Sequence, residues 1–477
     1  MHKNYIAGEW VSGADINLNI NPSDTNDIVG EYARADAAQA ELAVDAAYDA
    51  AQGWRKLTAE QRSDALDRIG SEVLSRREEL GTLLAREEGK TLAEGIGEAV
   101  RAGRVFKFFA GEALRLSGER LVSIRPGVEA DVRREPEGVV GIITPWNFPI
   151  AIPAWKIAPA LAFGNSVVFK PADLVPGSAW ALSEIIVRAG QLPPGVFNLV
   201  MGPGSKVGDV FAKSKKVKAI TFTGSTDTGR RIGMACVERG AKVQLEMGGK
   251  NPLIILNDAN LEQAVEVAVS GSYFSTGQRC TASSRLIVED GIHDKFVAAV
   301  AQRLAGLKVD NALAAGCDIG PVVSQAQLKQ DCDYIQIARD EGGRVVFGGE
   351  LLQRATPGYY LSPALIVDTD NQMRINREEV FGPVASVIRV NDYDEAVAVA
   401  NDTPFGLSSG ICTTSLKHAT DFKERSTAGM VMVNVPTAGV DYHAPFGGRK
   451  DSSYGSREQG SYAREFYTSV KTAYTLA

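Results

Sequence analysis

Short apolar runs rich in β-branched residues alternate with helical segments along almost the whole chain. Four of these runs are residues 139–143, 166–169, 218–222 and 243–246. Their length and composition are typical of strands that are buried on both faces. After Gly249 the alternation resumes, with runs at 253–256 and 285–288 around a helix that begins near Leu261. This order predicts an α/β fold with largely parallel sheets.

Two segments depart from this alternation. Thr58 and Gln61 form a capping-box pattern, which predicts a long amphipathic helix from Thr58 to about Glu88. Residues 120–135 alternate in polarity and carry many charges, which predicts a β-hairpin outside the parallel sheets. From the residues alone, this hairpin is equally compatible with a solvated surface feature.

Composition narrows the class of protein. The chain has 477 residues, enough for about three domain-sized units, with 44% apolar and 23% charged residues. Its net charge of −7 gives no electrostatic basis for binding nucleic acid or an anionic membrane surface. The N-terminus has no apolar run, so we expect no secretory signal. The most apolar stretch, 139–163, contains Asn147, Lys156 and several prolines, which argues against a spanning helix.

Cysteine and histidine usage points to a reducing compartment. The five cysteines have no paired spacing, which favours a cytoplasmic protein without a disulfide framework. The four histidines are not clustered, so we expect no metal site.

Cys280 and Glu246 are the two residues whose chemistry is most informative. A thiol forms a covalent thioester, and a carboxylate activates the water that hydrolyses it. Glu246 ends a buried run, where an unpaired carboxylate is costly. The alternatives are that Cys280 is inert packing and that Glu246 belongs to a structural ion pair. The other four cysteines have no comparable context.

Further motifs support the catalytic interpretation. They are residues 144–149 (TPWNFP), 222–229 (FTGSTDTG), 245–252 (LEMGGKNP), 277–282 (GQRCTA), 378–383 (EEVFGP) and 445–448 (PFGG). With these motifs in this order, the chain from about Gly8 to its C-terminus resembles the NAD(P)-dependent aldehyde dehydrogenase family. The resemblance implies a Rossmann-like cofactor domain (1–118 and 138–247) and an α/β catalytic domain (248–455). It also implies a β arm for oligomerisation (119–137 and 456–477) and a homodimer or homotetramer.

The resemblance assigns catalytic roles. Cys280 attacks the aldehyde, and the side chain of Asn147 with the backbone N–H of Cys280 stabilises the resulting oxyanion. Glu246 activates water for hydrolysis of the thioester, and Lys170 is counted with the catalytic residues. Asn147 could instead be a turn former, since asparagine favours such positions.

The cofactor site is predicted from a strand–turn–helix. The run 218–222 leads through Gly224 into a helix, whose N-terminal backbone N–H groups suit a pyrophosphate. The resemblance places Lys170 at the adenosine ribose, although a solvated strand end is the alternative. Asp173 would accept the ribose hydroxyls and favour NAD over NADP, and Lys206 could offset that preference. The other expected contacts are Ile143, Trp146, Gly204, Phe222, Ser225, Thr228, Glu379 and Phe381.

The substrate is predicted to carry a carboxylate. Arg279 directly precedes the nucleophile and is suited to bidentate carboxylate recognition, or else it pairs with a protein carboxylate. Residues 433–455 look like those of 2-oxoglutarate semialdehyde (2,5-dioxopentanoate) dehydrogenases. Trp155 stands where succinate semialdehyde dehydrogenases usually have an arginine. The apolar tunnel is expected to comprise Phe148, Trp155, Val440 and Phe446, which could equally be core.

Other functions remain as alternatives. Succinate semialdehyde or a broad range of aldehydes could be the substrate. A CoA-acylating dehydrogenase would normally lack the base that Glu246 supplies, and a structural protein on the same fold should have lost Cys280, Glu246 or Asn147.

Overall fold

In the computed structural model, which describes residues 1–476, the strands form two large sheets and two small ones. The first sheet has the order β19-β11-β10-β7-β8-β9-β1-β2. Its strands are β1 (Asn4–Ile6), β2 (Glu9–Val11), β7 (Val139–Ile143), β8 (Ser166–Lys170), β9 (Phe197–Leu199), β10 (Val217–Thr223), β11 (Lys242–Glu246) and β19 (Ser453–Tyr454). The five strands from β9 to β11 are parallel, as the apolar runs predict.

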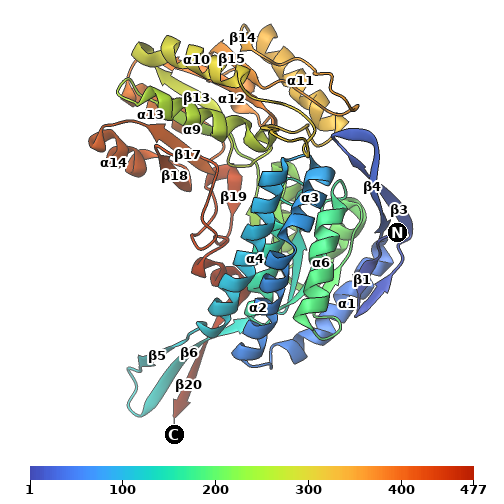
Figure 1. The fold of residues 1–477 in the computed structure, drawn as a ribbon. Coiled ribbons are helices and arrows are strands. Elements are labelled where there is room, and N and C mark those ends of the chain that lie inside the picture. Colours follow the sequence, from blue (N-terminus) through green and yellow to red (C-terminus); the bar gives the residue numbers. More distant parts are fainter. Residues whose placement is uncertain (477) are drawn as a thin grey trace.

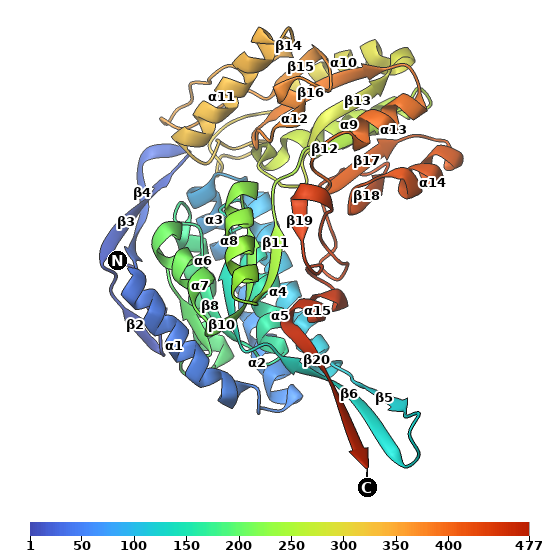
Figure 2. The same ribbon diagram turned by 180° about the vertical axis from the view of Figure 1, so that it is seen from behind.

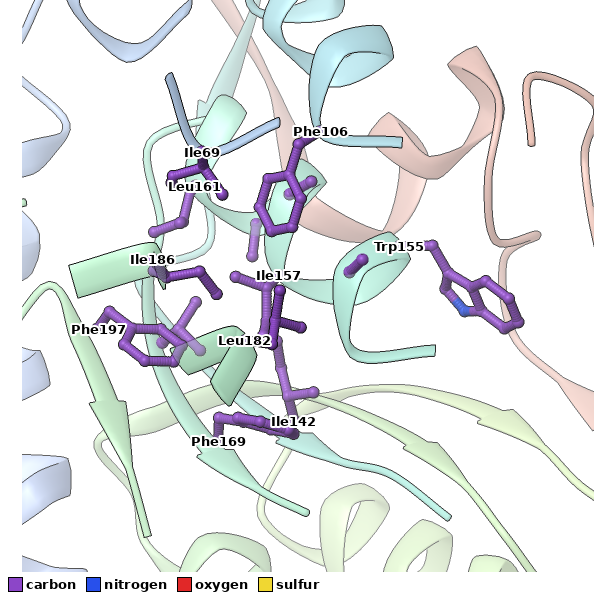
Figure 3. Close-up of a cluster of buried hydrophobic side chains, with 14 of the residues drawn as sticks. Ile69, Phe106, Ile142, Trp155, Ile157, Leu161, Phe169, Leu182, Ile186 and Phe197 are labelled. Atoms are coloured by element: carbon purple, nitrogen blue, oxygen red, sulfur yellow. The ribbon is translucent and has the colours of Figure 1, made fainter. Parts of the chain in front are cut away.

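Helices cover both faces of this sheet (Figures 1 and 2). They are α1 (Ala37–Trp54), α2 (Ala59–Ser75), α3 (Arg77–Glu88), α4 (Leu92–Leu114), α5 (Ala151–Ala162), α6 (Pro176–Gly190), α7 (Asp209–Lys213) and α8 (Thr226–Glu238). Helices α2 to α6 pack on one face, where Phe106, Ile157, Leu182 and Phe169 form part of the core (Figure 3). Helices α1, α7 and α8 pack on the other face. Side chains that alternate along each strand therefore enter two different cores.

The predicted helix from Thr58 to Glu88 is two helices. The capping box is confirmed, because Thr58 Oγ1 accepts from the backbone N–H of Gln61 and the Gln61 side chain accepts from the N–H of Thr58. The backbone leaves the helical conformation at Arg76, between α2 and α3. The Arg76 guanidinium there bonds Glu79 and Glu184. Apolar periodicity continues across the break, so it did not reveal the change of direction.

The second large sheet has the order β14-β15-β16-β13-β12-β17-β18, with only β14 antiparallel. Its strands are β12 (Asn251–Ile255), β13 (Ser283–Glu289), β14 (Arg344–Phe347), β15 (Ala364–Thr369), β16 (Val384–Val390), β17 (Ser408–Cys412) and β18 (Met430–Val433). Its helices are α9 (Leu261–Tyr273), α10 (Asp290–Ala305), α11 (Gln325–Asp340), α12 (Arg374–Arg377), α13 (Tyr393–Asn401) and α14 (Leu416–Arg425). We call the first large sheet with its helices the first body and the second large sheet with its helices the second body. The predicted α/β fold is confirmed in both.

The hairpin predicted at 120–135 forms a projecting arm (Figure 1). Strands β5 (Glu119–Val122) and β6 (Val128–Pro136) pair with each other, and β6 also pairs with β20 (Thr468–Leu476). Val122 and Ile124 in this arm are almost fully exposed, at 98% and 101%. An apolar tip without cover is unusual in a surface hairpin that meets only water.

Some segments cross between the two bodies. Ser453 and Tyr454 lie in β19 of the first sheet, although the predicted boundary put them in the second unit. Only the final strand of the predicted segment 456–477 joins the arm, because Phe466 and Tyr467 are buried in the first body. The hairpin β3 (Asp15–Asn21) and β4 (Asp24–Arg34) reaches the second body, where the Tyr360 hydroxyl donates to the Ser23 carbonyl at 2.6 Å. Within residues 1–476, no helix has the length and apolar character needed to span a membrane.

Candidate active site

Residues from both bodies line one cavity of about 240 Å³, which we call the catalytic cavity. Its lining residues are Pro145, Trp146, Asn147, Thr223, Gly224, Ser225, Met247, Gly248, Cys280, Gln327, Gln330, Glu379 and Phe381. Seven of these were predicted from the motifs: Trp146, Asn147, Gly224, Ser225, Cys280, Glu379 and Phe381. Motifs that are far apart in the sequence therefore meet around the thiol.

Cys280 lies just after a tight turn, the 3₁₀ segment Phe274–Gly277. Gly277 is required there, since its φ is +65° and a Cβ would lie 2.1 Å from the Gly382 carbonyl oxygen. The Asn251 side chain fixes the backbone by donating to the Cys280 carbonyl at 2.8 Å. Burial raises the pKa of the Cys280 thiol to about 12, and the nearby carboxylates of Glu379, Glu246 and Glu458 add to this effect. The thiol of the free protein is therefore protonated at neutral pH.

Asn147 is held by its backbone and keeps an amide hydrogen available. Its carbonyl accepts from the buried Lys90 ammonium at 2.6 Å, and Lys90 also bonds Glu98 at 2.8 Å. The Asn147 Nδ2 donates to the Gln278 carbonyl at 3.0 Å. Since an amide nitrogen carries two hydrogens, the second is left for an oxyanion beside Cys280.

Glu246 lies at the end of β11 and is buried. Ser453 Oγ donates to its Oε2 at 2.5 Å. No lysine or arginine nitrogen in residues 1–476 lies within the 4.0 Å ion-pair distance of Glu246, so the structural ion pair considered above is absent there. Burial raises the pKa of Glu246 well above its usual value, and the carboxylate of Glu458 raises it further.

Glu458 is the centre of a buried polar network behind Glu246. It forms an ion pair with Lys156 and accepts from the Trp155 indole nitrogen at 2.6 Å. Thr221 on β10 donates to the same carboxylate at 3.2 Å. No sequence motif pointed to Glu458, because its importance depends on contacts made by the C-terminal segment.

A second cavity of about 360 Å³ lies in the first body, among residues of β7, β8, α7 and α8. It is lined by Ile143, Lys170, Gly204, Ser205, Gly208, Asp209, Ala212, Lys213, Thr228, Arg231, Ile232 and Ala235, which include the predicted Ile143, Lys170, Gly204 and Thr228. Burial lowers the pKa of Lys170 to about 8, and its ammonium donates to the Pro171 carbonyl at 2.6 Å.

The start of α8 borders both cavities and fits a phosphate group. The side chain of Ser225 makes no capping bond to the helix backbone and instead bonds Thr228 Oγ1 at 3.0 Å. The first N–H groups of α8 are consequently free to meet a bound anion. At Gly204, a Cβ would approach no heavy atom more closely than 3.9 Å, which leaves room beside Lys170. The residues present therefore fit a dinucleotide.

Glu379 and Phe381 also line the catalytic cavity. Glu379 accepts from the Gly249 N–H at 2.7 Å, and burial raises its pKa to about 7. Phe381 has the unfavourable φ of +65° and packs edge-to-face on Trp146. Gln327 and Gln330, which the sequence did not indicate, each donate to the Val380 carbonyl at 2.9 Å and so hold this loop.

Two predicted cofactor residues do not line either cavity. Both carboxylate oxygens of Asp173 are engaged by Arg34, at 3.0 and 2.5 Å. A ribose could bind Asp173 only by sharing or displacing Arg34, so its role stays a prediction. Phe222 is buried beneath the turn, where a Cβ on Gly224 would lie 2.5 Å from its ring.

The predicted substrate residues fall into two groups. Val440 and Phe446 pack with Cys280 in one apolar cluster, and Trp155 contacts Phe446 with ring centroids 5.7 Å apart. Figure 3 shows Trp155 at the edge of the core, with its indole pointing away from the other side chains. Phe148 lies under the Lys90 ammonium, 3.8 Å from its ring centroid. The Arg279 guanidinium donates to the Ser270 carbonyl rather than pairing with a protein carboxylate.

Comparison with known proteins agrees with this geometry. Residues 10–473 match the aldehyde dehydrogenase family. The chain is 44% identical to the alpha-ketoglutaric semialdehyde dehydrogenase of Bacillus subtilis, covering 99% of this chain and 97% of that one. It is 41% identical to the alpha-ketoglutarate semialdehyde dehydrogenase of Haloferax volcanii, covering 99% and 98%.

A solved structure supports the same relationship. The betaine aldehyde dehydrogenase of Staphylococcus aureus in complex with NAD+ superposes with a TM-score of 0.97 at 36% identity, covering 100% of this chain and 95% of that one. The resemblance inferred from the motifs, including that to 2-oxoglutarate semialdehyde dehydrogenases, is confirmed. The chain belongs to the aldehyde dehydrogenase family.

Proposed function

We propose that this protein oxidises a carboxylate-bearing semialdehyde, 2-oxoglutarate semialdehyde, to the dicarboxylic acid with NAD+ as oxidant. The observation that carries the proposal is that Cys280 and Asn147 line one cavity, while the buried carboxylate of Glu246 is close enough to raise the pKa of the Cys280 thiol. The names of the relatives from Bacillus subtilis and Haloferax volcanii support the choice of substrate.

The first step belongs to Cys280 and Asn147. The thiol gives its proton to water, after which the sulfur forms a bond to the aldehyde carbon while the carbonyl π bond breaks and its oxygen becomes an oxyanion. The free amide hydrogen of Asn147 and the backbone N–H of Cys280 are the donors proposed for that oxygen. Such a donor commonly lowers the barrier by about 3–4 kcal/mol.

The last step belongs to Glu246. When NAD+ is bound, it supplies the hydride acceptor that turns the adduct on sulfur into a thioester. Glu246 in its ionised form takes a proton from water, whose oxygen bonds to the thioester carbon while the carbon–sulfur bond breaks. The products are the carboxylic acid and a regenerated Cys280, and the base favours hydrolysis over transfer to CoA.

The pyrophosphate would be held by the N-terminus of α8 together with Ser225 and Thr228. Lys170 would lie at the adenosine ribose. Glu379 and Phe381 would hold the nicotinamide half. NAD over NADP remains a proposal, because it rests on Asp173, whose carboxylate already pairs with Arg34.

We also propose that the protein is a homodimer or homotetramer that uses the arm. The exposed apolar residues Val122, Ile124 and Tyr474 on this sheet would be covered by a second copy. Light scattering of the intact protein and of a Val122→Lys/Ile124→Lys variant tests this, and an unchanged mass would contradict it.

The proposed activity is tested by following NADH formation with 2-oxoglutarate semialdehyde and with pentanal, a neutral aldehyde of equal chain length. A preference of at least tenfold in kcat/KM for the semialdehyde supports the substrate class, since tenfold corresponds to about 1.4 kcal/mol. Equal efficiency would leave an aldehyde dehydrogenase of broad range. The Glu246→Gln variant should form NADH in a burst and then nearly stop; unchanged turnover would remove Glu246 from its role.

A further inference from the structure

Arg101 on α4 is a half-buried arginine without an ionic partner. Its Nη2 donates to the Gln459 side-chain carbonyl at 3.0 Å, and its buried Nε has no acceptor. No carboxylate oxygen in the described residues lies within 4.0 Å of its guanidinium. An arginine in such surroundings destabilises the free protein, so its presence calls for a function in the bound state.

Gln459 supplies a second unsatisfied donor beside the guanidinium. Its side chain is fully buried, and its Nε2 has no acceptor because its Oε1 faces Arg101. The residue also has a φ of +59°, which is unfavourable for glutamine. Two neighbouring N–H groups without hydrogen-bond acceptors are complementary to a ligand group that only accepts hydrogen bonds, such as a carboxylate.

A chain of packed side chains, through Trp155 and Phe446, connects Arg101 with the nucleophile. The Arg101 guanidinium lies 5.6 Å from the Trp155 ring, and Trp155 packs on Phe446. Phe446 in turn packs in the apolar cluster with Cys280. Figure 3 shows that the indole of Trp155 points away from the other labelled side chains of the core.

The charges around Arg101 leave room for a ligand anion. Burial lowers the pKa of Arg101, whereas Glu98, Asp441 and a thiolate at Cys280 raise it. Glu98 is occupied by Lys90 and by the Ile150 N–H, at 2.8 and 2.9 Å. Asp441 is exposed and forms no ion pair with Arg101.

From this arrangement we infer that Arg101 and Gln459 bind the carboxylate of the semialdehyde whose aldehyde carbon is attacked by Cys280. The inference rests on the proposed function and names its specificity site. The guanidinium and the Gln459 amide each donate to the carboxylate, while Trp155 and Phe446 contact the methylene groups between the two ends.

Arg279 is the rival for the same role, since its Nε is also buried without an acceptor. Its guanidinium, however, is directed to the Ser270 carbonyl on α9, and it lies outside the cluster formed by Cys280, Val440 and Phe446. Methionine variants of the two arginines therefore distinguish the two assignments.

The kinetic test uses Arg101→Met, Arg279→Met and the control Arg104→Met, which removes an exposed arginine from the same helix. Methionine is unbranched and suits a helix, so packing changes little. We expect Arg101→Met to lower kcat/KM for 2-oxoglutarate semialdehyde at least tenfold and to leave pentanal within twofold. Arg101→Lys should recover part of the loss. If Arg279→Met loses the preference for the semialdehyde over pentanal and Arg101→Met keeps it, the inference is overturned while the proposed function stands.

A binding test does not depend on the proposed function. Glutarate, a dicarboxylate of the same length, should raise the Tm of the wild-type protein and inhibit pentanal oxidation competitively. Arg101→Met should have an unchanged or higher Tm and should lose both effects of glutarate, whereas Arg104→Met keeps them. Glutarate effects that persist in Arg101→Met would refute the site even if the semialdehyde is the substrate. Absence of a wild-type preference for the semialdehyde, with glutarate binding lost in Arg101→Met, would refute the substrate and retain the anion site.

Discussion

Glu246 and Glu458 are both buried, and the charge of Glu458 adds to the effect of burial in raising the pKa of Glu246. A group with a raised pKa is protonated over a wider pH range, so Glu246 becomes an effective base only as the pH rises. In the proposed mechanism, two residues from distant parts of the sequence would therefore set the acid limb of the pH profile for thioester hydrolysis.

Replacing Glu458 by glutamine should move this acid limb to lower pH. The change removes a negative charge and leaves the Lys156 ammonium, which itself lowers the pKa of Glu246. The pH dependence of hydrolysis, measured as the rate that follows the NADH burst, checks this expectation. Glu424→Gln, which changes an exposed carboxylate, is the control. A limb that stays in place or moves to higher pH would show that Glu458 does not control Glu246.

The thiol of Cys280 should be slow to alkylate at neutral pH. With a pKa near 12, the thiolate is about 10⁻⁴ of the total at pH 8, and its share grows tenfold per pH unit. Iodoacetamide labelling of Cys280, followed by peptide mass spectrometry between pH 7 and 9, should show this slope. Glu379→Gln should accelerate labelling, because it removes a charge that raises the thiol pKa. A rate that is independent of pH would mean that the thiol is already ionised.

Replacing Asn147 by alanine should lower kcat by about 10²–10³-fold with little change in KM, because the lost donor acts on the oxyanion. The loop should keep its position, since Lys90 bonds the Asn147 backbone carbonyl and not the side chain. Steady-state kinetics with pentanal, together with the Tm of the variant, separate catalysis from folding. A fall in kcat of less than about threefold would exclude Asn147 as an important donor.

Local patterns predicted the parts of this protein that depend on neighbours in sequence. The strand at 139–143 and the start of the helix at Leu261 were placed correctly, because a short apolar run and a helix start can both be recognised from neighbouring residues. The motifs around Asn147, Cys280 and Glu379 also meet as the family resemblance implied.

Features that depend on contacts between distant segments could not be predicted from local sequence patterns. Asp173 matched a ribose-binding position, but its pairing with Arg34 joins two segments whose approach no local pattern reports. No sequence motif singled out Arg101. It became informative only when its missing acceptor and its contact with Trp155 were visible.

Lys156 and Glu458 provide a test of stability that is separate from catalysis. Both side chains are buried, at 0% and 2% exposure, and they pair across the junction between α5 and the C-terminal segment. Lys156→Met should lower the free energy of unfolding by about 3–5 kcal/mol, because it leaves a buried carboxylate without its cation. Urea denaturation measures this loss, and Arg425→Met, which breaks an exposed pair with Asp394, should cost far less. The double variant Lys156→Met/Glu458→Leu should recover most of the loss, because neither member of the pair then leaves an unpaired buried charge. If the double variant is no more stable than Lys156→Met, the penalty comes from lost packing and not from an unpaired charge.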